Sequence, residues 1–320
     1  MHSCIFTGMK KFLLLFPLIL FAVAASCQRE DSFTVFNMLG DVKITMDIPA
    51  DFSPSKKNEI ILYALPNGNS TAQTMGKKMQ PGDDWHFDIQ HIKAQTGFIR
   101  KKLKDKNIVV VYLENDFKSW PLWKSKHPGY VSEVNRIVDT LYHMFSPSQT
   151  TICLNGHSGG GRFVFSYLDG VKNIPQYIDR IVFLDSDYGY ENQYGIQIHQ
   201  WLKANKHHSL QVFAYEDSLV EVNGKRIVSD TGGTWYRTHR MLKDLAAFYS
   251  FKSIERDSLM IYKSLNHQVG FYLKPNPEKK ILHTTQVELN GFIHSILAGT
   301  KYESDGYEYF GERAYKTSIK

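Results

Sequence analysis

The stretch Leu154-Asn155-Gly156-His157-Ser158-Gly159-Gly160-Gly161 decides the expected fold of this chain. It follows an apolar run at 151–154, which predicts a strand, and it opens a stretch from Arg162 that predicts a helix. A Gly-x-Ser-x-Gly pattern at such a junction is typical of a serine held in strained backbone, because the two glycines remove Cβ atoms that would clash in the tight turn. We therefore predict that Ser158 is presented as a nucleophile at the end of a strand.

Regular alternation of strands and helices surrounds this turn. The expected strands are 33–36, 42–48, 60–65, 108–113, 150–154, 181–184, 210–215 and 259–265. The expected helices are 88–104, 130–144, 159–168, 195–205, 234–249 and 284–297. Several strands are apolar on both faces, as in a covered parallel sheet. This order predicts one α/β domain with an eight-stranded, mostly parallel sheet and helices on both faces.

The N-terminus has the pattern of a targeting segment. Lys10 and Lys11 precede an apolar run at 12–25, which is too short to span a membrane and right for a signal peptide. Small residues directly before Cys27 resemble a bacterial lipobox, and the following residues resemble those of Bacteroidetes surface lipoproteins. We expect a signal peptide at 1–26, a lipidated Cys27, a tether at 27–32, and anchoring to the bacterial cell envelope, at the outer membrane. The alternative is ordinary secretion with cleavage near Ala25.

Composition excludes several classes of protein. The chain has 320 residues, of which 42% are hydrophobic and 22% charged, so it is long enough to bury a large core. The net charge of +6 is not concentrated in a basic stripe, and nucleic-acid binding is therefore not expected. Only Cys153 of the three cysteines lies inside the expected domain, so no disulfide is expected there. No Cys/His pattern has metal-ligand spacing, and neither a metal nor a cofactor is expected.

On the strength of the 154–161 motif and its place on the fifth of eight strands, the chain resembles the α/β-hydrolase superfamily over about residues 33–298. The resemblance implies an α/β-hydrolase domain at 33–300, followed by a tail at 301–320 that we expect on the surface. The segment between the sixth and seventh strands is short, so no large cap domain is expected. In the family, an acid usually follows the seventh strand and a histidine the eighth.

The resemblance assigns Asp217 and His267 to these two roles. Ala214-Tyr215-Glu216-Asp217 ends the seventh expected strand and matches the family's Gly-x-x-acid pattern, with Ala in place of Gly. His267 stands just past the eighth expected strand. Three other acids stay open as alternatives to Asp217, namely Asp185, Asp187 and Glu216.

The family pattern also implies an oxyanion hole made of two backbone N–H groups. One is the N–H of Gly159, the residue after the nucleophile. The other comes from the loop after the third strand, at 65–71, where Asn67-Gly68 replaces the family's His-Gly and points to the N–H of Asn69.

The expected walls of the site are loops at 115–130, 188–194 and 218–235. We expect Trp120, Trp123 and Trp235 to bind substrate, since aromatic side chains on open loops suit sugars. The polar and aromatic cluster at 82–86 could also reach the oxyanion loop. The alternative is that these aromatic residues pack their loops onto the sheet.

Together these features predict a serine hydrolase that cleaves a carboxylic ester, on a small molecule or an acylated glycan, through an acyl-enzyme on Ser158. A peptidase or amidase of the same fold is one alternative. The other is a non-catalytic surface lipoprotein that binds glycan. The complete set of Ser158, Asp217 and His267 favours an enzyme, because hydrolase homologues that have lost their activity usually lack one residue of the catalytic triad.

Overall fold

The computed structural model describes residues 31–222, 224–226 and 228–320. The expected signal peptide and the expected lipidation site at Cys27 lie outside these residues. Within the described residues, no helix is both long enough and apolar enough to span a bilayer.

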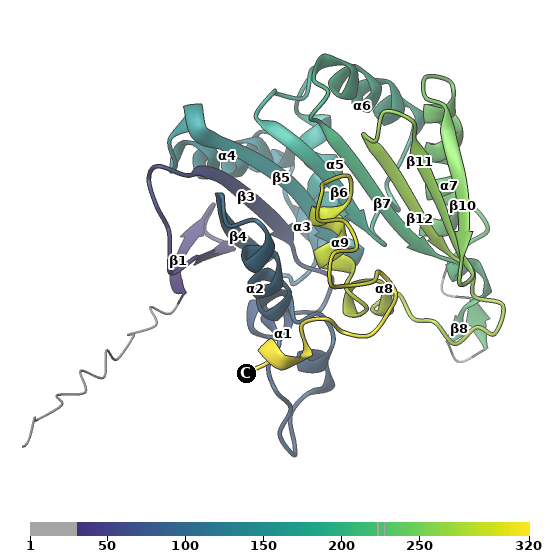
Figure 1. Ribbon diagram of the computed structural model, residues 1–320, viewed down its shortest axis with the longest axis horizontal. Helices are drawn as coiled ribbons and strands as arrows, with labels where there is room; N and C mark the ends of the chain where they lie inside the picture. Colours follow the sequence, from purple (N-terminus) through teal and green to yellow (C-terminus); the bar gives the residue numbers. More distant parts are fainter. Residues whose placement is uncertain (1–30, 223, 227) are drawn as a thin grey trace, which may run out of the picture.

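A ten-stranded mixed sheet forms the centre of the molecule, in the order β1-β2-β4-β3-β5-β6-β7-β12-β11-β10 (Figure 1). Its strands are β1 (Ser32–Met38), β2 (Val42–Ile48), β3 (Lys57–Ala64), β4 (Lys106–Asn115), β5 (Thr150–His157), β6 (Ile178–Leu184), β7 (Ser209–Tyr215), β10 (Phe251–Arg256), β11 (Leu259–Ser264) and β12 (Val269–Lys274). The run β4-β3-β5-β6-β7-β12 is parallel, and antiparallel strands extend it at both ends. A separate two-stranded hairpin joins β8 (Glu221–Val222) to β9 (Lys225–Arg226).

The prediction of eight strands is therefore wrong in a specific place. The run expected as the last parallel strand is β11, which pairs antiparallel with its successor β12. The strand parallel to β7 is β12, whose first residue Val269 is in register with Leu210. This difference reverses the direction of the chain near its C-terminal end, and it decides which loop reaches the edge that carries Ser158.

Helices cover both faces of the sheet (Figure 1). The α-helices are α1 (Thr71–Met75), α2 (Ile92–Lys102), α3 (Trp120–Lys126), α4 (Tyr130–His143), α5 (Gly161–Asp169), α6 (Asn192–Ala204), α7 (Thr234–Ala246), α8 (Thr285–Glu288) and α9 (Gly291–Leu297). Short 3₁₀ turns are η1 (Trp85–Asp88), η2 (Pro147–Gln149), η3 (Ser158–Gly160), η4 (Asp217–Leu219) and η5 (Lys316–Ser318). Helices α3 to α7 contribute to one hydrophobic core, and α2 and α9 contribute to the other.

Side chains along the central strands point alternately into these two cores. On β5, Ile152 and Leu154 belong to the core beneath α4 and α5, whereas Cys153 belongs to the core beneath α2 and α9. All three side chains are fully buried, so a strand apolar on both faces is covered on both faces, as the sequence predicts. Cys153 is a free, buried thiol.

The C-terminal tail differs from its expected place on the surface. Tyr307, Tyr309 and Tyr315 are buried and belong to the core beneath α2 and α9, with Tyr315 only 1% exposed. Burying three aromatic rings supplies a large hydrophobic stabilisation, which fixes the tail against the domain. The expectation of a surface tail is therefore wrong for these residues.

Candidate active site

Ser158 lies in a strained turn between β5 and α5. Its φ is +52°, a left-handed value that a non-glycine residue seldom adopts, and its exposed fraction is 9%. The glycines on either side permit this turn. A Cβ on Gly156 would lie 2.7 Å from the carbonyl carbon of Gly160, and one on Gly160 would overlap the carbonyl oxygen of Ala64. The turn predicted from the Gly-x-Ser-x-Gly pattern is present.

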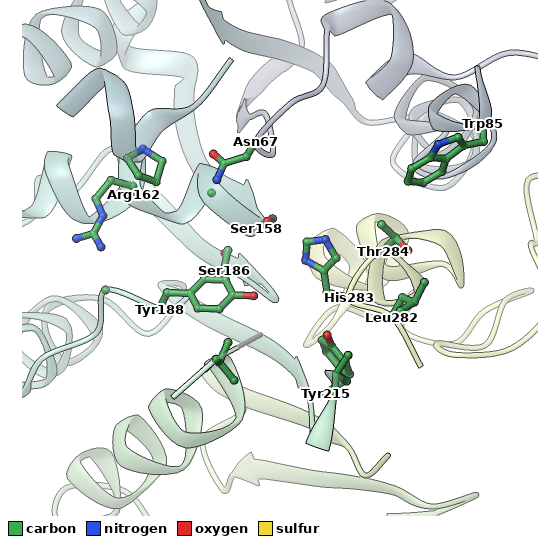
Figure 2. Close-up of a pocket in the computed structure, with 15 residues that line it drawn as sticks. Asn67, Trp85, Ser158, Arg162, Ser186, Tyr188, Tyr215, Leu282, His283 and Thr284 are labelled. Atoms are coloured by element: carbon green, nitrogen blue, oxygen red, sulfur yellow. The ribbon is translucent and has the colours of Figure 1, made fainter. Parts of the chain in front are cut away.

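A pocket of about 570 Å³ opens at this end of the parallel strands. Ser158 and Gly159 line it from the turn after β5, and Asn67 lines it from the loop after β3. His283, from the segment after β12, faces Ser158 across the pocket, and the Tyr215 side chain at the end of β7 lies below it in this view (Figure 2). Ligand sites at the carboxyl ends of parallel strands are the rule for α/β sheets.

The imidazole of His283 is placed to accept a proton. Its Nδ1 lies 3.7 Å from Oδ2 of Asp185, and its ring centre lies 5.2 Å from that of the buried His157. Burial lowers the pKa of His283 below its usual range. The ring is therefore neutral at pH 7, which is the form a general base requires.

Two buried carboxylates stand behind His283, and a threonine on α7 joins them. The Thr234 hydroxyl donates to Oδ1 of Asp185, and the Thr234 N–H donates to Oδ2 of Asp217 over 2.8 Å. Asp217 thereby caps the N-terminus of α7. A Cβ on Gly233 would overlap the Asp217 carboxylate, so the helix start and this acid fit closely together.

Only one of these two acids approaches the histidine. Oδ2 of Asp185 has no hydrogen-bond partner within the described residues and faces Nδ1 of His283. Both oxygens of Asp217 instead accept backbone N–H groups, from Thr234 at 2.8 Å and from Trp235 at 3.4 Å. The geometry therefore favours Asp185, which the sequence left open as an alternative to Asp217.

The electrostatics of Asp185 and Asp217 favour a positive charge that forms on His283 during the reaction. Burial, and secondarily the negative charge of Asp217, raises the pKa of Asp185 well above its usual range. Burial also raises the pKa of Asp217, and the N–H groups of Thr234 and Trp235 oppose that rise. A desolvated carboxylate with no cation beside it gains most from an imidazolium formed next to it.

The other two acids that the sequence left open have separate roles. Oδ2 of Asp187 accepts a hydrogen bond of 2.8 Å from the hydroxyl of Thr238 on α7, and burial raises the pKa of Asp187 to about 8. Oε2 of Glu216 accepts the N–H of Asn276 over 3.0 Å. Both contacts fix loops and helices around the site.

The expectation that His267 lies beside Ser158 is wrong. His267 sits in the turn between β11 and β12, two residues before Val269, which is in register with the start of β7. Asp217 follows the other end of β7, so at about 3.3 Å per residue roughly 20 Å of strand separates the two side chains. His267 lines a different pocket, at the amino ends of the parallel strands.

The second expected oxyanion donor, Asn69, also does not fit the site. The N–H of Asn69 closes a turn on the carbonyl of Pro66 over 3.5 Å, and the N–H of Gly68 donates to the carbonyl of Lys118 over 2.8 Å. Asn67 lines the pocket instead, and its side chain lies so close to Gly159 that a Cβ there would overlap it. The loop is the expected one, and the residue nearest the expected donor Gly159 is Asn67.

The three expected substrate-binding tryptophans lie elsewhere. Trp120 and Trp123 are 2% and 1% exposed, pack edge-to-face on each other, and belong to the core. Trp235 is half-buried and lines a neighbouring hollow beside Asp217. Trp85 does line the pocket and is 63% exposed, so one residue of the cluster at 82–86 reaches the site.

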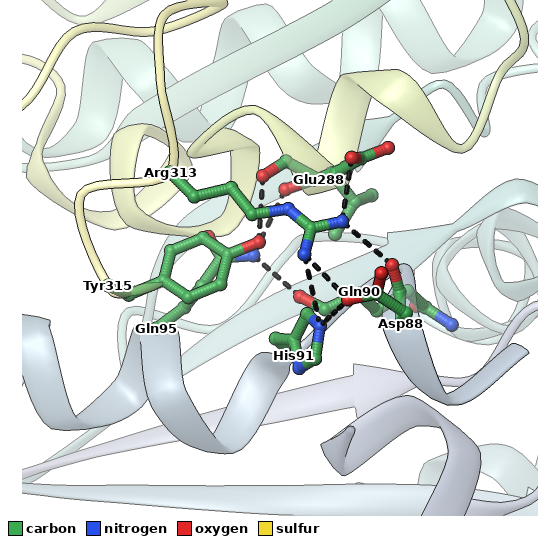
Figure 3. A network of polar contacts seen from close by, with 8 residues as sticks. Asp88, Gln90, His91, Gln95, Glu288, Arg313 and Tyr315 are labelled. Atoms are coloured by element: carbon green, nitrogen blue, oxygen red, sulfur yellow. Dashed lines mark hydrogen bonds and ion pairs between the residues drawn. The ribbon is translucent and has the colours of Figure 1, made fainter. Parts of the chain in front are cut away.

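The C-terminal tail joins two loops that carry pocket residues (Figure 3). The Arg313 guanidinium donates to Oδ1 of Asp88 over 2.6 Å and to Oε1 of Glu288 over 2.7 Å. Asp88 ends the turn that begins with Trp85, and Glu288 ends α8, which begins two residues after His283. Arg313 therefore ties the Trp85 turn to the segment that carries His283.

Sequence reasoning missed His283 because it placed the final strand one hairpin too early. The signal was present, since 269–273 is an apolar run and Pro275 ends it shortly before His283. Gly270 inside that run made it less strand-like than 259–265. Within the described residues no group of three or more potential ligands could hold a metal ion.

Comparison with known proteins places the fold. No protein-family model matches the chain, and no curated protein matches it in sequence. Among solved structures, a feruloyl esterase module from Clostridium thermocellum complexed with sinapinate has a TM-score of 0.52 at 11% identity, covering 88% of this chain and 92% of that one. A structure described as FAE has a TM-score of 0.51 at 10% identity, with the same coverage. The chain therefore has an α/β-hydrolase-like fold.

Proposed function

We propose that this protein is a serine hydrolase of carboxylic esters, with Ser158 as nucleophile, His283 as general base and Asp185 as the acid that orients it. The observation that carries the proposal is the meeting of three features in one pocket. These are a serine in a left-handed strand-to-helix turn, a neutral histidine across from it, and a buried carboxylate 3.7 Å behind that histidine.

The chemical steps follow from this arrangement. Nδ1 of His283 faces Asp185, so Nε2 takes the hydroxyl proton as Ser158 Oγ attacks the carbonyl carbon of the ester. The N–H groups of Gly159 and Asn67 stabilise the oxyanion. His283 then returns the proton to the departing alcohol, which leaves an acyl group on Ser158. Water, deprotonated by the same nitrogen, attacks the acyl carbon, and its proton goes to Ser158 Oγ as the acid is released.

Two observations support an ester of a glycan rather than a peptide as the substrate. One of the two solved structures reported above is a feruloyl esterase module. Trp85 and Leu282, which are 63% and 56% exposed, line the same pocket as Ser158 and offer apolar surface to a sugar ring or an aromatic acyl group. We propose an acylated glycan as the physiological substrate.

Labelling with a fluorophosphonate probe tests the proposal, because the probe reacts with an activated serine. Protein lacking residues 1–27 should be labelled stoichiometrically, with the label on the peptide that contains Ser158, and should hydrolyse aryl acetates. The Ser158→Ala variant should retain its circular dichroism spectrum and melting temperature while losing both activities. A folded protein that neither reacts nor hydrolyses any ester would contradict the proposal.

Cys27, outside the described residues, completes the proposal with export and lipid attachment. Replacement of Cys27 by Ala should move the protein from the membrane fraction to the soluble fraction of expressing cells. Retention in the membrane fraction would contradict lipid attachment at this residue.

A further inference from the structure

Arg162 brings a positive charge into the pocket that contains Ser158. It is the second residue of α5, four residues after Ser158, and its side chain is half-buried. In Figure 2 it lies on the same side of the pocket as Tyr188, while Trp85 and Leu282 lie on the other side, with Ser158 between them. The guanidinium lies at the outer end of this wall, so a substrate at Ser158 reaches it with a group that extends toward the side of Tyr188.

The Arg162 guanidinium has no ion-pair partner among the described residues. Within the described residues, no carboxylate lies within 4.0 Å of it. Nearby arginines on α7 are paired, since Arg237 and Arg240 approach Glu191 at 2.8 and 3.2 Å. Arg162 is also in the first turn of its helix, where the helix dipole disfavours a cation. An unpaired cation in an unfavourable position is a mark of function rather than of stability.

The rest of the pocket leaves the charge uncompensated. Among the described residues that line it there is no Asp and no Glu, and Arg162 is the only side chain with a permanent charge. The pKa of His283 is lowered by burial, so that ring is neutral at pH 7. The lining of the pocket therefore presents one positive charge to a ligand, while the acids Asp185 and Asp217 lie behind His283.

Gly189 leaves the space that the guanidinium occupies. A Cβ on Gly189 would lie 3.0 Å from Nη1 and 3.2 Å from Cζ of Arg162, and 2.9 Å from the ring of Phe165. The absence of a side chain at Gly189 thus leaves room for the guanidinium at the pocket wall. A guanidinium without a carboxylate partner has N–H donors that can bind a carboxylate in a bidentate manner.

We propose that Arg162 recognises a carboxylate on the substrate, so that the preferred ester is one that carries a free acid group extending from the cleaved bond toward the Arg162 wall of the pocket. This inference rests on the proposed function, because it assigns the substrate class of the same site. A carboxylate would supply the counter-charge that the pocket lacks and would accept two parallel N–H donors from the guanidinium. Sugar acids and aromatic diacids both carry such a group.

Two pairs of rigid esters test this recognition, and in each pair a carboxylate is compared with the matching amide. Monomethyl terephthalate and methyl 4-carbamoylbenzoate place the group on the acyl side. 4-Acetoxybenzoate and 4-acetoxybenzamide place it on the alcohol side. The quantity measured is the ratio of kcat/KM for the carboxylate to kcat/KM for the amide, in wild type, Arg162→Gln, Arg162→Lys and Arg136→Gln. Arg136 is the matched control, because it is exposed on α4 and does not line this pocket.

We expect the wild type to prefer the carboxylate in at least one pair. Since hydrogen bonds to charged groups are strong, Arg162→Gln should lower that ratio by about tenfold to a hundredfold. Arg162→Lys should recover part of the ratio, and Arg136→Gln should leave it at the wild-type value. High salt should reduce the preference. A wild-type ratio near one in both pairs, or an equal change in the Arg162→Gln and Arg136→Gln variants, would overturn the proposal.

Calorimetric binding to the Ser158→Ala protein separates this proposal from the proposed function. The carboxylate esters should bind about tenfold or more tightly than their amides, and the difference should disappear in the Ser158→Ala/Arg162→Gln double variant. Such binding without any turnover by the wild type would remove the esterase proposal and keep the recognition of the carboxylate. Turnover by the wild type without a preference for the carboxylate in either assay would keep the esterase proposal and remove the recognition of the carboxylate.

Discussion

The two edges of the parallel sheet each carry a histidine from the same part of the chain, and only one of them faces a nucleophile. His267 lies in the turn between β11 and β12, at the amino edge, where it is exposed. His283 follows β12, at the carboxyl edge, in the pocket that contains Ser158. Sixteen positions along the chain separate them. The comparison teaches that strand direction, rather than distance along the chain, decides which histidine can act.

The largest expected effect is that of His283→Asn, with His267→Asn as its matched comparison. His283→Asn removes the proposed base, so kcat for ester hydrolysis should fall by about 10⁴-fold or more, because members of a catalytic triad act as a unit. His267→Asn retains a residue that tolerates the left-handed backbone at this position, where φ is +61°. Its kcat should stay near the wild-type value. Steady-state kinetics on 4-nitrophenyl acetate measures both. A severe loss in His267→Asn with a mild one in His283→Asn would break the comparison.

The next effect concerns the two buried carboxylates at the carboxyl edge. Asp185→Asn removes the negative charge beside Nδ1 of His283, so kcat should fall by about 10³- to 10⁴-fold with the fold retained. Asp217→Asn weakens a helix cap, so the free energy of unfolding should fall by about 1 kcal/mol while activity falls much less. Urea denaturation and kinetics on the same preparations separate the two roles. The opposite pattern would restore Asp217 as the acid.

The smallest expected effect concerns the tail that ties the Trp85 turn to the His283 segment. Arg313→Gln should lose the ion pairs to Asp88 and Glu288, lowering the free energy of unfolding by about 1–2 kcal/mol and kcat/KM by a few fold. Lys316→Gln is the control, since Lys316 is an exposed neighbour whose contact with Glu312 is 3.4 Å. Equal behaviour of the two variants in thermal denaturation and kinetics would show that the ion pairs of Arg313 have no influence on the site.

Much of the fold could be predicted from local patterns. Apolar runs on both faces of β3 to β7 are a sufficient signal of a covered parallel sheet, and the glycines around Ser158 are a sufficient signal of its turn. The order of strands near the C-terminus could not be predicted in this way. Two neighbouring apolar runs, β11 and β12, can each be the final parallel strand, and only pairing with β7 distinguishes them.

The site could be predicted only in part for a similar reason. Aromatic residues such as Trp120 look alike in sequence whether they pack a core or face a substrate, and burial decides between these roles. Asp185 and Asp217 both follow parallel strands, so both reach the carboxyl edge. The two acids differ in the hydrogen bonds that they accept from α7, a helix that is distant from them in sequence. These contacts depend on tertiary packing, which periodicity does not encode.

A crystal structure of the protein with a fluorophosphonate bound to Ser158 tests the central claim most directly. The claim predicts the imidazole of His283 beside the phosphonyl group, with Nδ1 within hydrogen-bond distance of Asp185, and the N–H groups of Gly159 and Asn67 on the phosphonyl oxygen. His267 should remain at the opposite edge of the sheet. An adduct in which another histidine approaches Ser158, or in which His283 turns to Asp217, would contradict the account.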